Sequence, residues 1–525
     1  MKRKYLGLLI ALGMILFAAV GCSNNDKESK DSNEATKSNK SYDDEMNIAV
    51  TAQPPTLDSV MTVSQVALDI AGNIYETLYT LNEKYEPTPM LAKSVDVSDD
   101  GKTYTFHLRE GVKFHNGKEM ASDDVVASMN RWLEKSSRAK SLLGGAKFET
   151  QDPYTTVLHL EKPSSDVLIA MASQSNFPAI MPKEIIESAP AEGVTEYIGT
   201  GPFKFKEWKQ DQFIHLVKND DYQAVGEKPS GFAGKKEALV NDVYYHFVTD
   251  HSTRIAGIQT GEYDIADNIP TESYEQLSTM DHVKVHTFEG GTLTMFFNVN
   301  EGPLADVKLR QAVNTALNMD EILLASFVNE DLYELNPSYM NPNQPQWASD
   351  AGKKVYNQGD LEKAKKLLKE AGYNGEEITL LTTQDYGEMY TATIVVQEQL
   401  RQLGMNVKVA NYDFPTFLEK KNDRSSWDIF ITSNGYQLIP PQLLALTPDW
   451  AGNDNPQIKA LIAEIREAET PEAAKAKWDE LQGFLYEYLS STVIGQYKSI
   501  LATTDKLEDF EVFEAPIIWN TKVVK

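Results

Sequence analysis

The stretch that decides the fold runs from Tyr75 to Lys135 and reads YETLYTLNEKYEPTPMLAKSVDVSDDGKTYTFHLREGVKFHNGKEMASDDVVASMNRWLEK. Its first residues, 75–81, predict a helix end that gives way to a short strand. Residues 103–108 then alternate polar and apolar side chains, which is the period of a half-buried β-strand. The segment therefore predicts a sheet with one face against a core.

The second part of this stretch predicts a turn, a further strand and a helix. Residues 110–111 turn the chain into a strand around 112–114, and the Asn-Gly pair at 116–117 is a tight-turn signal. Ser122 is expected to cap a helix over 122–135, whose first turn carries two aspartates that suit the helix dipole. The apolar stripe of this helix is made of Val125, Val126, Met129 and Trp132.

The order of these pieces resembles the extracytoplasmic solute-binding proteins of ABC importers, and within them the large peptide/nickel-binding family, family 5. A single motif of this kind is weak, but several in family order are specific, and together they cover nearly the whole chain after residue 45. The resemblance is carried by YETL, DGKTYTFHLREGVKFHNG, the helix start at 122–125, IGTGPFKFKEW (198–208), GEYDIAD (261–267), FFNVNEGPLADVKLRQAVNTALN (296–318) and LEKAKKLLKEAGY (361–373).

The resemblance implies an α/β, bilobal, periplasmic-binding-protein-like fold, in which two lobes joined by a hinge carry a small extra α+β domain. Chain crossings near residues 198 and 500 are expected to form the hinge. The expected division places 46–74, 198–290 and 500–525 in lobe I, 75–197 in the extra domain and 291–499 in lobe II.

Length and charge limit the classes of partner. The 525 residues suffice for two or three domains. The net charge of −27 argues against nucleic acid, whose recognition needs Lys and Arg, and against an anionic membrane surface as a direct partner.

The N-terminus is expected to be a targeting segment. Residues 2–4 are basic, and 5–20 form an apolar run that is short for a membrane-spanning helix. The small residues before Cys22, the only cysteine, resemble a bacterial lipobox, which implies that 1–22 is a lipoprotein signal peptide and Cys22 the lipidated residue. The alternative is an ordinary cleaved signal with an incidental cysteine.

Residues 23–45 are rich in Ser, Asn, Lys and acidic side chains and show no apolar period. They predict a disordered tether that holds the folded body off the lipid. The expected location is the extracytoplasmic face of the cell membrane, with a lipid anchor, as suits a Gram-positive cell surface.

Candidate ligand contacts come first from the loop after QPPTLD (53–58), which borders the cleft in the family. Ser64 and Gln65 offer a hydroxyl and an amide there, although Ser64 is equally suited to cap the next helix. Arg138 falls where metal-chelate binders of the family place a ligand-facing arginine, and the alternative is a surface arginine.

In the second lobe, 378–383, 389–403 and 406–411 predict a strand–helix–strand unit, and ligands approach such units at the carboxyl ends of the strands. Thr383, Asp385 and Tyr386 are candidates for this reason. Further helices are expected over 306–317, 360–371, 455–469 and 471–489.

The run 427–440 supplies the other candidates, Asn434, Tyr436 and Gln437. In family members that bind free peptides an aspartate of this run pairs with the ligand amine, and here Ile439 stands in its place. The arginines expected near 383–384 and at Pro178 are also missing. Asp385 could replace the amine anchor, and Tyr436 offers apolar area with a polar end.

The sequence has no HExxH, GxSxG or phosphate-cradling GxxxxGK[ST] motif, and its eight histidines are scattered. We expect no catalytic residue, no metal site and no cofactor. The expected function is reversible binding by two lobes that close over a solute.

The resemblance implies a lipid-anchored, monomeric substrate-binding component of an ABC importer. It would capture oligopeptides or a small peptide-like solute and deliver them to a membrane permease and its ATPase. One alternative is a nickel or metal-chelate receptor, and another is a surface sensor that retains the fold without transport.

Overall fold

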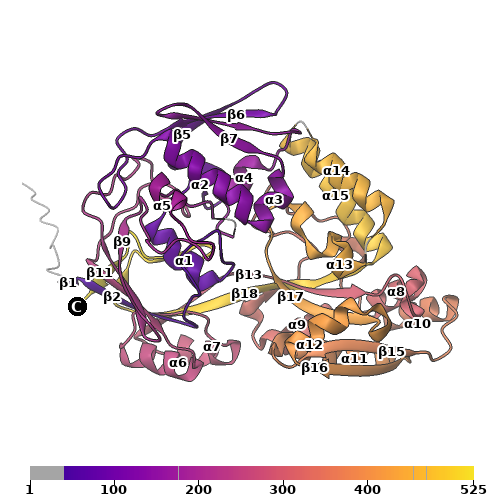
Figure 1. The fold of residues 1–525 in the computed structure, drawn as a ribbon. Coiled ribbons are helices and arrows are strands. Elements are labelled where there is room, and N and C mark those ends of the chain that lie inside the picture. Colours follow the sequence, from indigo (N-terminus) through magenta and orange to yellow (C-terminus); the bar gives the residue numbers. More distant parts are fainter. Residues whose placement is uncertain (1–40, 176, 453, 469) are drawn as a thin grey trace, which may run out of the picture. The chain divides into compact units, whose positions relative to one another are not determined.

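An eleven-stranded sheet runs through residues 41–525, which the computed structural model describes except for 176, 453 and 469 (Figure 1). We call the strands from β12 to β9 the β2 side of this sheet, and those from β17 to β16 the β15 side. The strand order is β16 (Asn406–Tyr412), β15 (Glu377–Thr383), β17 (Ile429–Gly435), β13 (Val283–Phe297), β18 (Ser491–Thr504), β12 (Ile265–Ala266), β2 (Glu45–Val50), β11 (Asp242–Phe247), β10 (Phe213–Lys218) and β9 (Phe203–Lys209), with β14 (Tyr333–Glu334) paired to β18.

The two sides are joined by β13 and β18, which have 15 and 14 residues. They pair antiparallel from Val283 opposite Thr504 to Phe296 opposite Ser491. The chain therefore passes to the β15 side along β13 and returns along β18. The crossing expected near residue 198 is wrong, because this residue precedes β9 within the β2 side, whereas residue 500 does lie in β18.

The β2 side begins earlier in the chain than expected. β2 is parallel to both β11 and β12. The tether predicted to extend to residue 45 is too long, because β1 (Tyr42–Asp43) already pairs antiparallel with β22 (Lys522–Val524) and so belongs to the folded body. Helices α1 (Gln65–Ile74) and α6 (His251–Thr260) also belong to the β2 side.

On the β15 side the predicted strand–helix–strand unit is confirmed, with β15 and β16 parallel around α11 (Gly387–Leu403). Aspartates begin two predicted helices: the Asp306 carboxylate accepts from the Lys308 backbone N–H at 2.8 Å, and that of Asp360 from the Lys363 N–H at 2.9 Å. These helices are α8 (Val307–Ala316) and α10 (Leu361–Glu370). The other helices of this part of the chain are α9 (Met319–Phe327), α12 (Phe414–Asn422), α13 (Pro448–Ala451), α14 (Pro456–Arg466) and α15 (Pro471–Tyr488).

A separate four-stranded sheet lies within residues 75–197, in the order β5 (Ala92–Val97), β6 (Thr103–Leu108), β8 (Thr155–His159) and β7 (Lys147–Asp152). The predicted alternation in β6 is confirmed, since every second side chain from Tyr104 to Leu108 is buried. The strand expected around 112–114 is wrong: this segment makes one bridge, Lys113 to Glu119, because the tight turn at 116–117 follows too soon. The segment also holds the hairpin of β3 (Tyr79–Leu81) and β4 (Pro87–Pro89) and the helices α2 (Ser122–Lys135), α3 (Ser137–Leu143), α4 (Val167–Ala172) and α5 (Lys183–Glu187).

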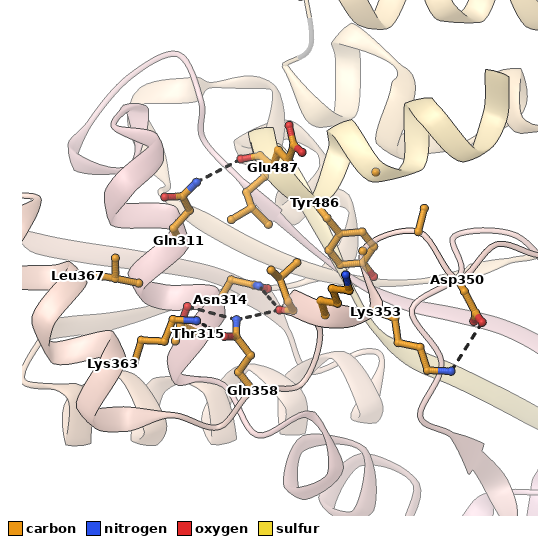
Figure 2. Close-up of a pocket in the computed structure, with 16 residues that line it drawn as sticks. Gln311, Asn314, Thr315, Asp350, Lys353, Gln358, Lys363, Leu367, Tyr486 and Glu487 are labelled. Carbon is orange, nitrogen blue, oxygen red and sulfur yellow. Dashed lines mark hydrogen bonds and ion pairs between the residues drawn. The ribbon is translucent and has the colours of Figure 1, made fainter. Parts of the chain in front are cut away.

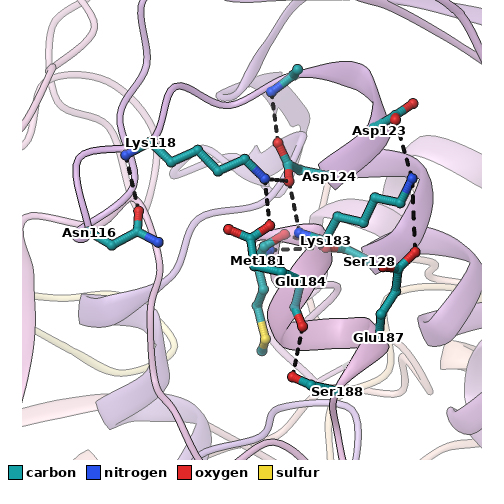
Figure 3. A network of polar contacts seen from close by, with 11 residues as sticks. Asn116, Lys118, Asp123, Asp124, Ser128, Met181, Lys183, Glu184, Glu187 and Ser188 are labelled. Atoms are coloured by element: carbon teal, nitrogen blue, oxygen red, sulfur yellow. Dashed lines mark hydrogen bonds and ion pairs between the residues drawn. The ribbon is translucent and has the colours of Figure 1, made fainter.

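The start of α2 differs from the prediction, because Ser122 lies inside the helix and its buried hydroxyl donates to the Thr155 carbonyl at 3.1 Å. The Asp124 carboxylate caps the helix instead, accepting from the Ala121 N–H at 3.0 Å (Figure 3). Its other oxygen accepts from Lys118 Nζ at 2.6 Å and from the Lys183 N–H at 2.8 Å. One buried carboxylate thus joins α2 to α5.

Stacked rings fill the core where β13 meets β17. The Phe296 and Phe430 rings are parallel with centroids 4.7 Å apart, and Trp427 meets Phe430 edge-on at 4.8 Å. Such contacts fix strand positions firmly. The remaining elements are α7 (Tyr274–Ser278), β19 (Leu507–Glu508), β20 (Glu511–Val512) and β21 (Pro516–Ile517).

Candidate binding site

The two predicted ligand loops of the β15 side lie at one edge of the sheet. β15 and β17 are parallel neighbours, with Leu381 opposite Phe430, so that both strands end at the same edge. The Ser433 hydroxyl donates to the Glu388 carboxylate at 2.8 Å, which links the end of β17 to the first turn of α11. The structure therefore brings together the candidates that follow β15 and those that follow β17.

The three candidates after β15 make contacts that shape their loop. Thr383 is fully buried, and its hydroxyl accepts from the Asp385 N–H at 3.2 Å. The exposed Asp385 carboxylate accepts from the Phe414 N–H at 2.7 Å, and the Tyr386 ring meets the Phe414 ring edge-on at 4.7 Å. One oxygen of Asp385 thus holds the start of α12, and a ligand role for these residues stays a prediction.

The candidates after β17 surround a cavity of about 20 Å³, which is the volume of a single water site. Tyr436 Oη donates to Gln496 Oε1 at 2.7 Å, and Gln496 Nε2 in turn donates to the Ser338 carbonyl at 2.7 Å. Gln437 Nε2 donates to the carbonyl of Gly435 at 3.1 Å, and Asn434 lies opposite Thr292 of β13. Tyr436 is therefore fixed in place by β18.

Two glycines of β13 allow the close packing around these residues. The register of β13 against β18 shifts between Glu289 and Gly291, which leaves Gly290 as the extra residue of a β-bulge. A Cβ on Gly290 would enter the Tyr497 ring, and a Cβ on Gly291 would meet the Asn434 carbonyl oxygen. Bulges that redirect side chains are common next to binding sites.

Three candidates make local contacts. Ser64 caps α1, its hydroxyl accepting from the Ala67 N–H. Arg138 Nη1 donates to the Ser175 carbonyl at 2.8 Å, and burial lowers the pKa of this arginine. Gln65 Nε2 donates to the Asp69 carboxylate at 2.7 Å. In the described part of the chain we find no contact between these three side chains and the 434–437 run.

Asp69 belongs to a group of neighbouring acidic residues that was not predicted from the sequence. Burial, and then the neighbouring carboxylates of Asp267 and Glu514, raise the pKa of Asp69 well above its ordinary range. Burial likewise raises the pKa of Asp267, and it raises that of Glu514 to about 7. All three side chains nevertheless remain partly exposed to solvent. These carboxyls are therefore largely desolvated without being closed off from solvent.

The acidic group continues toward the β15 side through Tyr85 of the β3–β4 turn. Burial, then the carboxylates of Glu514 near the C-terminus and Glu289 of β13, raise the pKa of Tyr85. Burial raises the pKa of Glu289 of β13, which accepts from Asn343 Nδ2 at 2.6 Å. Burial and then Glu289 raise the pKa of Tyr436. We call Asp69, Asp267, Glu289 and Glu514 the acidic line.

Sequence signals for the acidic line exist but are weak. Asp69 interrupts the otherwise apolar run VALDIAG, Asp267 directly follows a short strand, and Glu514 stands alone in VFEAPIIW. An acid among apolar residues marks either a paired core group or a site. No local pattern in the sequence predicts that these acids lie near one another in the fold, because they are separated by up to several hundred residues.

The described residues hold neither a cluster of metal ligands nor a helix suited to cross a membrane. No group of three His, Cys, Asp or Glu side chains among them could hold a metal ion. Within the same residues, none of the helices has the length and apolar character needed to span a bilayer. Cys22, the predicted lipidation site, lies outside the described residues.

The family model described as "Bacterial extracellular solute-binding proteins, family 5 Middle" matches residues 86–456. A probable peptide ABC transporter periplasmic-binding protein of Sinorhizobium fredii is 30% identical over 88% of this chain and 90% of its own length. The oligopeptide-binding protein AppA of Bacillus subtilis is 27% identical over 83% and 81%. NikA of Brucella suis, solved in complex with Fe(III)-EDTA, shares the fold with a TM-score of 0.76 at 19% identity, covering 90% of this chain and 97% of its own.

Proposed function

Because the chain belongs to the bacterial extracellular solute-binding proteins of family 5, we propose that it captures a peptide or peptide-like solute with a free amino group. It is an extracytoplasmic component of an ABC transporter with the bilobal α/β fold of that family. The proposed cycle is reversible binding without covalent chemistry by a monomer, followed by delivery to a membrane permease and its ATPase.

The acidic line is the observation that supports this ligand class. Like charges that are partly desolvated raise each other's pKa, as Asp267 and Glu514 do for Asp69. A ligand ammonium group among them would relieve this repulsion and would gain charge-assisted hydrogen bonds. An anionic solute would instead add to the repulsion. This makes the acidic line the substitute for the aspartate that Ile439 replaces, a role that the sequence had suggested for Asp385.

Strands β13 and β18 suit the hinge motion that this function requires. They are the connections through which the sheet passes from one side to the other. Asp69 and Asp267 of the acidic line belong to the β2 side, whereas Glu289 lies on β13, within the connection itself. A ligand that contacts both groups favours the closed state, because only that state completes its contacts.

The ligand class is tested by isothermal titration calorimetry with trialanine and with N-acetyl-trialanine, which lacks the free amine. Hydrogen bonds to charged groups are worth roughly 1.5–3 kcal/mol, so we expect the acetylated peptide to bind at least about tenfold more weakly. Glu514→Gln is expected to reduce this difference. The matched control is Glu511→Gln, an exposed glutamate of the same segment, which should retain it. Equal affinity for the two peptides would contradict the proposed ligand class.

We further propose that Cys22 carries the lipid anchor and that residues 23 to about 40 act as the tether at the cell surface. Two or more acyl chains are needed for stable attachment. Mass spectrometry of the mature N-terminal peptide should show a diacylglyceryl cysteine. Cys22→Ser should release the protein into the medium, and continued membrane attachment of this variant would contradict the proposal.

A further inference from the structure

A large pocket, none of whose lining residues belongs to the acidic line, is shown in Figure 2. It is enclosed by α8, α10, the 350–358 loop and the C-terminal end of α15, all on the β15 side. Its volume of about 920 Å³ is within the range of about 300–1,000 Å³ of small-molecule sites. We call it the α8–α15 pocket.

The body of the pocket is apolar and its position is fixed. Leu367, Val355 and Leu489 line it together with Tyr486, whose buried hydroxyl donates to the Pro337 carbonyl at 2.7 Å. Gly352, with φ of +90°, lies directly on the Tyr486 ring, where a Cβ would overlap it. Most of the wall therefore offers contact area to an apolar group.

The walls are locked together by Arg310 behind the pocket, which is 1% exposed. Its guanidinium donates to the Leu304 carbonyl at 2.7 Å on one side and to the Tyr488 carbonyl at 2.7 Å on the other. This arginine ties the start of α8 to the end of α15. The pocket is thus preformed, and a ligand would pay little to order it.

One polar atom of the wall has no partner. Asn314 is 2% exposed and lines the pocket, and its Nδ2 donates to the Val355 carbonyl at 3.0 Å. That contact fixes the direction of the amide, and among the described residues Asn314 Oδ1 finds no donor. A buried acceptor without a donor costs about 1–3 kcal/mol, so the site is suited to a ligand that brings an N–H or O–H.

Lysines stand at the rim of the pocket. Lys353 pairs with Asp350 at 3.7 Å, and Lys363 Nζ donates to Gln358 Oε1 at 2.6 Å. Lys354 is exposed, and the structure gives it no ion pair within the described part of the chain. Asp350 and Glu487 also line the pocket, so that its three lysines and two acids leave a net charge of +1, which complements an anionic group.

We propose that the α8–α15 pocket binds a small amphipathic anion: an apolar, preferably aromatic body with a carboxylate at the lysine rim and a hydrogen-bond donor for Asn314. This is a second site, distinct from the one proposed for the transported solute. Its occupant would contact Leu489, two residues before the start of β18, and would stabilise the folded protein as any ligand of the native state does.

The probes for this site are phloretate, a phenol with a propionate side chain, and two relatives that each lack one feature. Hydrocinnamate lacks the phenol hydroxyl, and tyrosol carries an uncharged alcohol in place of the carboxylate. Binding to the purified protein is followed by saturation-transfer NMR and calorimetry. We expect phloretate to bind, and each relative to bind at least threefold more weakly.

Variants assign the binding to this pocket. Lys354→Glu at the rim should weaken phloretate binding at least threefold, whereas Lys366→Glu, an exposed lysine of α10 that does not line the pocket, should leave it unchanged. Asn314→Leu should abolish the preference for phloretate over hydrocinnamate, and its thermal unfolding is measured to establish that it folds. If Asn314→Leu does not fold, the proposal is tested by the affinity of Lys354→Glu for phloretate.

Three results would overturn the proposal: no binding of any of the three compounds, equal binding to the wild-type protein and Lys354→Glu, or displacement of phloretate by trialanine. The last result would place phloretate in the solute site. Since trialanine binding is measured separately, failure of the second site and failure of the proposed function can be told apart.

Discussion

Glu514 is the residue whose charge depends most directly on pH near neutrality. Burial raises the pKa of its carboxyl from 4.5 to about 7 in the folded protein. Because the folded pKa exceeds the unfolded one, the stability that this group contributes to the ligand-free protein is fully present below about pH 4.5 and is lost as the pH rises through about 7. Binding of an amine ligand, however, requires the ionised carboxylate of Glu514.

We therefore predict that peptide affinity increases with pH. Trialanine should bind about fivefold more weakly at pH 6 than at pH 7, since most Glu514 carboxyls must first lose a proton at the lower pH, whereas the peptide amine, whose ordinary pKa is about 7.7–8.0, stays mostly charged over this range. Calorimetry across this range measures the effect. Glu514→Gln should flatten the profile, and an equally steep profile in this variant would assign the proton to another group.

Gly291 offers a test of the close packing at the bulge of β13. A methyl group in Gly291→Ala would meet the Asn434 carbonyl oxygen and push β17 away from β13, which we expect to cost about 1–3 kcal/mol of unfolding free energy. Urea denaturation measures this cost. The control is Gly435→Ala at the position opposite Gly291, where the nearest atom lies 3.9 Å from the added Cβ, so that little change is expected. Equal costs at the two positions would contradict the packing described.

At the scale of single elements, local sequence patterns predicted those helices and strands whose formation depends mainly on neighbouring residues. The alternation in β6, the helices predicted over 306–317 and 360–371 and the β15–α11–β16 unit are confirmed, since each depends on residues that are close together in the sequence. Ser122 failed as a cap because its hydroxyl is taken by β8, more than thirty residues away, and Asp124 is then free to cap α2.

The α2 helix is also held to the β2 side by a buried ion pair. Arg131 donates to both oxygens of Asp58, at 3.0 and 2.5 Å, and the Val194 N–H donates to the same carboxylate at 2.8 Å. The Asp58 side chain is fully buried. Removing one partner of such a pair leaves an uncompensated charge.

We predict that Asp58→Ala lowers the unfolding free energy by about 3–5 kcal/mol. Chemical denaturation with circular dichroism measures it. Asp123→Ala on the same helix removes an exposed ion pair with Lys183 and should cost less than about 1 kcal/mol. Similar losses in the two variants would show that the Asp58–Arg131 pair does not secure α2.

At the scale of the whole molecule, the sequence predicted the fold class but only part of the candidate site. The candidates after β15 were predicted from a strand end and those of the 427–440 run from the family resemblance, and a ligand role for both sets stays a prediction. Asp69, Asp267, Glu289 and Glu514 were missed because they come from α1, the end of β12, β13 and the β20–β21 turn, which only the tertiary fold brings near one another and which no local pattern encodes.

The central claim is that the chain captures a peptide or peptide-like solute by its free amine, and native mass spectrometry of the freshly purified protein tests it most directly. The bound species is released in the instrument and fragmented. We predict masses and fragments of short peptides or of a small compound with a free amino group. A single bound species with the isotope pattern of a metal chelate, or an organic anion without an amine, would contradict the account.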